Sequence, residues 1–250
     1  MTWFIDTLFG YGFLQTYILT HVGTLSQGTS LALWIIGAVA IIAVGYLLGS
    51  INFAIIISGK TYHEDIRQHG SKNAGMTNMM RTYGKKAAGL TLLGDALKAV
   101  VACLFGYALF GQLGAYMAGM ACVFGHVFPI FYKFKGGKGV VTTAVTILMC
   151  NPFVFIILFA LFVAILAMTK YLSLASIMSV LMYPFILNGI EVWLNGGCPY
   201  VLFALIIALL VIFKHKDNIK RLQNRTESKF SFKKSVAPPA KTDDNTNSEQ

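Results

Sequence analysis

Long apolar runs separated by short polar loops dominate the chain and predict helices that span a membrane. The first three runs cover residues 31–58, 88–110 and 113–131, and two more cover 172–189 and 200–213. A helix needs about 20 apolar residues to cross roughly 30 Å of hydrocarbon at 1.5 Å per residue. The pattern therefore predicts an all-α fold, a polytopic transmembrane helical bundle.

The run at 140–169 is too long for one untilted span and short for two. The pair Asn151-Pro152 interrupts it, and proline breaks a helix because it lacks a backbone donor and clashes with the preceding turn. We therefore expect two short helices, roughly 140–150 and 152–169, which brings the expected total to about seven transmembrane helices.

Composition and charge extend this picture. The chain is 56% hydrophobic and 12% charged, whereas soluble domains contain roughly 25% charged residues. Of its 20 Lys and Arg residues, 18 lie in 59–86, 132–139 and the tail from 214. Basic loops stay on the cytoplasmic side during insertion, so these segments should share that face. The N-terminus is then outside and the C-terminus cytoplasmic, which requires two crossings within 140–169.

The two ends of the chain differ from its middle. Residues 1–30 are aromatic-rich with a single charge, Asp6, and predict an extracytoplasmic interfacial segment. Residues 31–222 form the expected transmembrane domain, and 223–250 read as a cytoplasmic, mostly disordered tail. The cysteines are scattered and the histidines fit no zinc spacing, so we expect neither a metal site nor another cofactor.

Two charged residues lie inside an apolar run. Asp95 and Lys98 are three residues apart, so they share a helix face. Ionisable groups within spans usually point into a protein interior or an aqueous cavity. A buried structural ion pair, or a lysine reaching toward the basic face, would explain them equally well.

The loop at 70–81 has the composition of an anion site. Glycine, asparagine and small hydroxyls fill it, and an arginine flanks it on each side. Such loops present backbone amides to anions, and arginine binds phosphate through two parallel bonds. A solvated connecting loop is the alternative. The candidate residues are Arg67, Ser71, Asn73, Gly75, Thr77, Asn78 and Arg81.

A second glycine-rich segment precedes the run at 140. Lys135, Gly136, Gly137, Lys138 and Gly139 lead directly into that apolar helix. The segment is not a Walker A loop, whose Gly-x-x-x-x-Gly-Lys-Ser/Thr pattern is absent. Free amides at a helix N-terminus nevertheless bind phosphate. Anchoring at the cytoplasmic face would explain the lysines but not the glycines.

Further polar pairs occur near the same face. Ser173 and Ser176 are three residues apart, as are His215 and Asn218. Ser50 lies within the first apolar run, where a serine usually bonds its own backbone. Together these segments predict a membrane-embedded pocket for anionic ligands that carry phosphate.

From about Gly45 to Leu222 the chain resembles the bacterial membrane-integral acyl-phosphate:glycerol-3-phosphate acyltransferases. The resemblance rests on ordered motifs: Gly49-Ser50-Ile51, the loop from Ser71 to Arg81, Asp95-x-x-Lys98, Gly125-His-x-Phe-Pro, Phe134-Lys-Gly-Gly-Lys-Gly139, Ser173-Leu-Ala-Ser176 and His215-x-x-Asn218-Ile-x-Arg-Leu222. Three positions depart from the family. Asn52 replaces a usual proline, and Lys72 and Ala99 replace usual glycines. We expect Lys72 to matter most, through loop conformation and local charge.

The resemblance implies an enzyme of phospholipid synthesis. It would move a fatty acyl group from acyl phosphate to the 1-hydroxyl of glycerol 3-phosphate, giving lysophosphatidic acid and phosphate. The expected location is the inner cell membrane, with the active site facing the cytoplasm. Membrane lipid and the enzyme that makes acyl phosphate are further expected partners, whereas nucleic acid is not.

The same resemblance assigns roles to the residues above. Catalysis is expected of Ser50, Lys138, His215 and Asn218. Substrate binding is expected of Arg67, Ser71, Asn73, Gly75, Thr77, Asn78, Arg81, Lys98, Lys135, Gly136, Gly137, Gly139, Ser173 and Ser176. Either His215 or a phosphate oxygen of the donor could accept the proton of the hydroxyl.

Two other classes of protein also fit parts of the pattern. An anion transporter uses basic, glycine-rich loops at broken helices, but it needs a polar path to the outer face, where the loop at 190–199 offers only Glu191. A non-catalytic scaffold could hold anionic lipids on its basic loops. It would not need amides and small hydroxyls in three separate segments.

Overall fold

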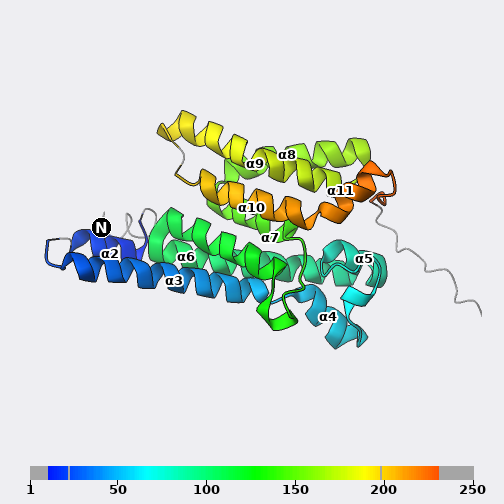
Figure 1. Ribbon diagram of the computed structural model, residues 1–250, viewed down its shortest axis with the longest axis horizontal. Helices are drawn as coiled ribbons and strands as arrows, with labels where there is room; N and C mark the ends of the chain where they lie inside the picture. Colours follow the sequence, from blue (N-terminus) through cyan, green and yellow to red (C-terminus); the bar gives the residue numbers. More distant parts are fainter. Residues whose placement is uncertain (1–10, 22, 198, 231–250) are drawn as a thin grey trace, which may run out of the picture.

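Helix α3 (Gln27–Ser50) lies along helix α6 (Lys85–Val127) in a close contact built on glycines (Figure 1). A Cβ added at Gly45 or Gly49 would overlap the backbone of Ala118 or Cys122. Small residues let two helix backbones approach closely in a membrane, where the hydrophobic effect no longer drives association. These glycines therefore permit the close pairing of α3 with α6.

The computed structural model describes residues 11–21, 23–197 and 199–230. Within these residues every regular element is a helix, which confirms the all-α prediction. Beside α3 and α6, the α-helices are α2 (Phe13–Thr20), α4 (Phe53–Tyr62), α5 (Met76–Tyr83), α7 (Val140–Cys150), α8 (Pro152–Thr169), α9 (Leu172–Asn195), α10 (Val201–Lys214) and α11 (Lys216–Gln223), with 3-10 turns η2 (Ile66–Gln68) and η3 (Ile130–Tyr132).

Helix α6 reverses at Phe110 and Gly111, as the separate runs at 88–110 and 113–131 predict. Gly111 has φ 55° and ψ −140°, a combination that side chains other than hydrogen rarely permit. A Cβ at Gly106 would overlap the carbonyl of Gly114, and a Cβ at Gly114 would overlap the carbonyl of Gly106. The two halves of α6 can pack this tightly only because both positions lack a side chain.

The expected continuous helix over 31–58 is wrong at one point. Helix α3 ends at Ser50 and α4 begins at Phe53. Asn52 causes the new start because its side-chain Oδ1 accepts a hydrogen bond from the Ile55 amide at 3.1 Å, the geometry of an N-cap. Hydropathy could not show this break because apolar residues continue on both sides of it.

The expected division of 140–169 is confirmed, since α7 ends at Cys150 and α8 begins at Pro152. Asn151 caps α8 by accepting a hydrogen bond from Val154 N at 3.1 Å. Pro152 occupies the first helical position, where its missing donor costs nothing.

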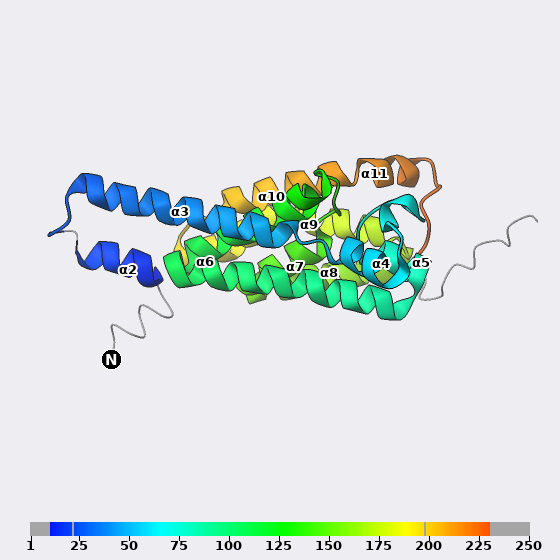
Figure 2. The same ribbon diagram turned by 90° about the horizontal axis from the view of Figure 1, so that it is seen from below.

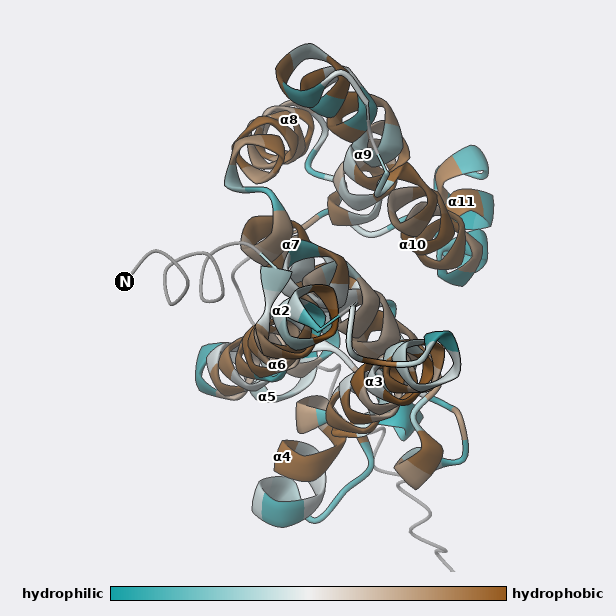
Figure 3. Ribbon diagram, turned by 90° about the vertical axis from the view of Figure 1, so that its left-hand side faces the viewer, coloured by the Kyte–Doolittle hydropathy of each residue, from teal (hydrophilic) through white to brown (hydrophobic). Residues whose placement is uncertain are grey.

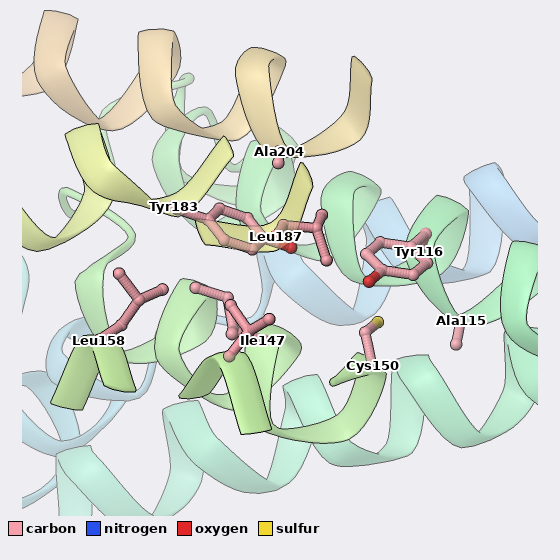
Figure 4. Close-up of a cluster of buried hydrophobic side chains, with 9 residues drawn as sticks. Ala115, Tyr116, Ile147, Cys150, Leu158, Tyr183, Leu187 and Ala204 are labelled. Atoms are coloured by element: carbon pink, nitrogen blue, oxygen red, sulfur yellow. The ribbon is translucent and has the colours of Figure 1, made fainter. Parts of the chain in front are cut away.

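A buried apolar cluster lies between α6 and the helices α7, α8 and α9 (Figure 4). Tyr116 of α6 packs there with Ile147 of α7, Leu158 of α8, and Tyr183 and Leu187 of α9. Each of these side chains is at most 5% exposed. The cluster places α7, α8 and α9 in fixed positions beside α6.

Hydrophobic residues make up most of the bundle's helices (Figure 3), and many large apolar side chains on them are exposed. Among the residues that the structure describes, four segments are long and apolar enough to cross a membrane: 27–62, 85–132, 152–169 and 172–195. Helices α7 and α10 are shorter apolar helices. Figures 1 and 2 show α4, α5 and α11 at one end of the bundle and α2 at the other.

The predicted terminal segments are only partly described. Residues 1–10 of the expected interfacial segment and 231–250 of the expected tail lie outside the described residues. Helix α2 packs against α3 and α6. At the other end, Phe230 N donates to the carbonyl of Lys170 at 2.7 Å, so the chain beyond α11 returns to the start of α9.

Candidate functional site

A cavity of about 1190 Å³ lies among α5, α6, α7, α8, α9 and the α10–α11 corner. Part of its wall is polar and includes most of the residues expected at the site: Ser71, Asn73, Gly75, Thr77, Asn78, Arg81, Lys138, Gly139, Ser173, Ser176, His215 and Asn218. Another part is apolar, formed by Leu148, Phe155, Leu158, Phe159, Phe162 and Val180. One cavity thus combines an anion-binding composition with room for a hydrocarbon chain.

The loop at 70–75 is shaped by the buried side chain of Asn78. Its Oδ1 accepts from Ser71 N at 2.9 Å, and its Nδ2 donates to the carbonyls of Ile66 and His69 at 3.1 and 2.9 Å. Asn78 therefore shapes the loop, while helix α5 begins beside the cavity at Gly75 without a side-chain cap. Amides at such an uncapped N-terminus are available to an anion.

Lys72 takes a left-handed conformation, with φ 57°. This φ suits glycine and costs other residues roughly 1 kcal/mol. The loop keeps the backbone geometry of a glycine although it carries a lysine.

The glycines at 136, 137 and 139 allow the second loop to pack tightly. A Cβ at Gly136 would overlap the carbonyl of His126, and Gly137 N donates to that carbonyl at 3.1 Å. Gly139 has φ 81° and starts helix α7 without a side-chain cap. This second uncapped helix start borders the cavity, so the fold brings two of them to one site.

Lys138 crosses the cavity wall to the α10–α11 corner, where its Nζ donates to Asn218 Oδ1. Burial lowers the pKa of Lys138 to about 8, and the charge of Arg221 adds to this effect. The ammonium is therefore largely charged at pH 7. It is also poorly hydrated, which strengthens its attraction for a phosphate.

His215 has a defined tautomer. Its Nδ1 lies 2.7 Å from the carbonyl of Val211, and a carbonyl only accepts, so Nδ1 carries the proton and Nε2 has the free lone pair. Burial lowers the pKa of His215 to about 4; the bond to Val211 opposes this and the charge of Lys138 adds to it. At neutral pH the ring is an uncharged hydrogen-bond acceptor.

Two buried hydroxyls lack partners within the described part of the chain. Thr143 Oγ1 and Ser179 Oγ have no hydrogen bond there, and both residues line the cavity. The Ser173 hydroxyl, by contrast, interacts with Glu227. Buried polar groups are normally paired, so the two unpaired hydroxyls indicate a polar ligand.

Glu227 is a cavity residue that the sequence did not reveal. Asn218 Nδ2 and Arg221 Nε each donate to its carboxylate at 2.7 Å. Burial raises the pKa of Glu227, but the bonds from Arg221 and Asn218 outweigh it, so the net pKa is lowered. The residue lies in the expected tail, where no hydrophobic period signals that the chain returns to the site. Glu227 binds the Nδ2 atom of Asn218, while Lys138 binds its Oδ1 atom, so both ends of the Asn218 amide are held.

Several expected site residues do not line the cavity: Ser50, Arg67, Lys98, Lys135, Gly136 and Gly137. Ser50 Oγ donates to the carbonyl of Tyr46 at 2.9 Å. Arg67 pairs with Asp65 at 2.7 Å and donates to the carbonyls of Tyr132 and Lys135 at 3.1 and 3.2 Å. Arg67 thus ties the two glycine-rich loops together.

Across the described residues, no group of three or more His, Cys, Asp or Glu side chains could hold a metal ion.

The chain is similar to known proteins of one family. A family model described as glycerol-3-phosphate acyltransferase matches residues 39–225. A glycerol-3-phosphate acyltransferase of Alkaliphilus metalliredigens is 41% identical over 196 residues, covering 78% of this chain and 97% of the relative. One from a Thermoanaerobacter species is 42% identical over 199 residues, covering 80% and 98%.

Two solved structures are similar as well. Both are crystal structures of PlsY, an integral membrane glycerol 3-phosphate acyltransferase. Its glycerol 3-phosphate form is 34% identical, with a TM-score of 0.70, and covers 78% of this chain and 96% of that one. Its lysophosphatidic acid form is 32% identical, with a TM-score of 0.67 and the same coverage.

Proposed function

This chain belongs to the glycerol-3-phosphate acyltransferase family, and we propose that it transfers a fatty acyl group from acyl phosphate to the 1-hydroxyl of glycerol 3-phosphate. The products are lysophosphatidic acid and inorganic phosphate. The observation that carries the proposal is a single cavity that joins two uncapped helix starts and Lys138 to an apolar wall. Such a cavity suits two phosphorylated reactants, one of which has a hydrocarbon tail.

The chief task of the site is to hold two anions side by side. Two phosphates in a medium of low dielectric constant repel each other by several kcal/mol. Lys138, Arg81, Arg221 and the amides that begin α5 and α7 surround the cavity and offset this repulsion. Correct alignment of two bound reactants contributes as much as ~7–11 kcal/mol to lowering a barrier.

In the reaction, the 1-hydroxyl oxygen attacks the acyl carbonyl carbon and forms the ester bond. The bond from that carbon to the phosphate oxygen breaks, and the phosphate leaves with both bonding electrons. The donor is a mixed anhydride and already activated, so no covalent enzyme intermediate is required. Lys138 stabilises the charge that develops on the leaving phosphate.

The hydroxyl proton passes to the donor phosphate in this proposal. His215, with a pKa of about 4, is a weaker base than a phosphate dianion, whose conjugate acid has a pKa of roughly 6. His215 Nε2 instead accepts a hydrogen bond from the hydroxyl and orients it. Asn218, held between Lys138 and Glu227, supports this orientation. Ser50 takes no chemical step because its hydroxyl bonds the carbonyl of Tyr46.

The membrane supplies one reactant and receives one product. Of the 20 basic residues, 18 lie in segments 59–86, 132–139 and 214–241, so we place the polar part of the cavity at the cytoplasmic face of a seven-helix bundle. Glycerol 3-phosphate then enters from the cytoplasm, the acyl tail remains among the helices, and an enzyme that makes acyl phosphate provides the donor.

One assay tests the proposed reaction. Purified protein in detergent is incubated with glycerol 3-phosphate and either palmitoyl phosphate or palmitoyl-CoA, and phosphate and lysophosphatidic acid are measured. We expect equal amounts of both products with palmitoyl phosphate and neither with palmitoyl-CoA. Lysophosphatidic acid formed from palmitoyl-CoA alone would refute the donor assignment.

Activity should fall at alkaline pH. Lys138 is charged below its pKa of about 8 and loses that charge as the pH rises through this value, so kcat/KM should decline above pH 8. In Lys138→Arg the decline should move to higher pH, because a guanidinium remains charged. Substrate phosphate titrates near pH 6 in both proteins and does not alter the comparison. An identical alkaline decline in both would exclude Lys138 as its cause.

A bulkier side chain on the apolar wall should change the preferred chain length. Leu148 lines the cavity nine residues beyond Gly139, roughly 13 Å along α7 at 1.5 Å per residue. Leu148→Trp should reduce kcat/KM for palmitoyl phosphate more than for octanoyl phosphate. Leu181→Trp, at a half-exposed position of α9 outside the cavity lining, is the control. Equal losses for both donors would place the acyl chain elsewhere.

A further inference from the structure

The buried ammonium of Lys98 has an unusually complete set of partners. Its Nζ lies 2.9 Å from the carbonyl of Gly49, 2.6 Å from that of Ile51, 2.9 Å from His126 Nδ1 and 2.9 Å from Asp95 Oδ1. The side chains of Lys98 and Asp95 are each 2% exposed. An ammonium has only three protons to donate, so Lys98 is saturated by protein. Lys98 does not line the cavity, whereas Asp95 and His126 do.

Two of these partners belong to the break between α3 and α4. Carbonyls at a helix C-terminus lack partners within the helix, and the bilayer interior offers no water to replace them. Lys98 satisfies the carbonyls of Gly49 and Ile51 and so fixes where α3 ends. Directly after the break, Asn52 Nδ2 donates to the carbonyl of Ala74 at 3.4 Å. The break is thereby connected to the loop at 70–75.

The third partner leads to the other glycine-rich loop. His126 Nδ1 lies 2.9 Å from Lys98 Nζ and 3.5 Å from Asp95 Oδ1, so the imidazole closes the Asp95–Lys98 cluster. Nε2 packs directly on Gly137, where an added Cβ would overlap it, and the His126 carbonyl accepts from Gly137 N at 3.1 Å. Lys98 is therefore linked, through His126, to the segment that carries Lys138.

We propose that Lys98, supported by Asp95 and His126, is a positioning residue that sets the separation of the loops at 70–75 and 136–139 across the cavity. The inference rests on the proposed function, in which these loops hold the two anionic reactants. Lys98 acts through the loops and touches neither substrate. Its contribution is geometric, because two reactants misplaced by about 1 Å react roughly 10²-fold more slowly.

The test must avoid leaving a buried charge alone, because one unpaired partner of a buried ion pair is strongly destabilising. The double variant Asp95→Asn/Lys98→Met removes both charges with little change in volume. His126→Phe removes the ring nitrogens, and His126→Asn keeps a polar group near the position of Nδ1. Thr91→Val is the matched control: Thr91 is buried on the same helix, and its hydroxyl bonds only the Ala87 carbonyl at 2.9 Å.

Three measurements are made on each purified variant: the Kd for glycerol 3-phosphate by calorimetry, kcat with palmitoyl phosphate, and the distance between spin labels at Lys72 and Lys133. Labels are placed in a background whose four native cysteines are alanine. We expect Asp95→Asn/Lys98→Met to remain folded, to lose about 10²-fold in kcat and to broaden the label distance distribution. His126→Phe should do the same, His126→Asn should restore part of kcat, and Thr91→Val should match the wild type.

Combining the substitutions at Lys98 and His126 tests whether Lys98 positions the loops or binds substrate directly. If Lys98 acts through His126, combining Asp95→Asn/Lys98→Met with His126→Phe should cost little more than either change alone. Additive losses in kcat, or an unchanged label distribution, would overturn the inference. If the wild type binds glycerol 3-phosphate but releases no phosphate, the proposed reaction fails, while the label distances still decide the inference. If the wild type binds no glycerol 3-phosphate, the label distances alone decide it.

Discussion

Lys138→Ala should reduce phosphate release from palmitoyl phosphate by at least about 10³-fold, the upper range for removing one group that stabilises developing charge. Lys138 is the cation that reaches from the loop before α7 to Asn218 across the cavity wall. Without it, the leaving phosphate would lose a compensating charge, and Asn218 would lose its hydrogen bond to Lys138 and keep the one to Glu227. Both effects act on kcat, so the loss should persist at saturating substrate.

Controls separate this effect from misfolding and from overall charge. Lys86→Ala removes a basic residue at the exposed start of α6, outside the cavity lining, and should keep wild-type kcat. Lys138→Arg restores the charge but not the size, and should recover part of the activity. A purified, monodisperse Lys138→Ala protein with near wild-type turnover would remove Lys138 from the mechanism.

His215→Ala should lower kcat by about 10²-fold, the low end for losing a group that manages a proton, while the protein still inserts and remains folded. The side chain is buried, with its Nδ1 bonded to Val211 and its Nε2 available to a substrate hydroxyl. His215→Gln distinguishes the two roles that are open to this residue. If His215 orients the hydroxyl, the glutamine oxygen can accept the same bond and restore activity. If His215 instead takes the proton of the hydroxyl, glutamine should not restore activity, because an amide oxygen is too weak a base to accept that proton.

The pH profile provides an independent check of the same point. With a pKa of about 4, His215 is neutral above pH 5, so its replacement should not alter the profile between pH 5 and 7. His63→Asn is a suitable control, because His63 lies outside the cavity lining with φ 56° and asparagine tolerates that conformation. A His215→Ala rate within about threefold of the wild type, a difference worth only ~0.7 kcal/mol, would exclude any important role.

The helices follow from the sequence because their causes are local. The apolar runs and Asn151-Pro152 act within a few residues of themselves, and they predicted where α6 reverses and where α7 ends. The break after Ser50 was missed because its signal is a single capping side chain, Asn52, within continuous hydropathy.

The site required more than local pattern. The composition of the loops predicted that phosphate-binding residues would share one face, and the fold brings Ser71, Lys138, Ser173 and His215 to one cavity. Residue type could not separate the residues that line the cavity from those that support it. Arg67 and Lys138 are both basic residues of glycine-rich segments, yet one braces two loops and the other faces the cavity.

By itself, the sequence determined the class of protein, the reversal of α6 and the division between α7 and α8, because hydropathy and proline act over short distances and charge is summed along the chain. Only the tertiary structure decided that Lys98 is enclosed by Gly49, Ile51, Asp95 and His126, and that Glu227 returns to Asn218. Those contacts join residues up to 49 positions apart. Which distant groups meet depends on how whole helices pack, and no local pattern encodes it.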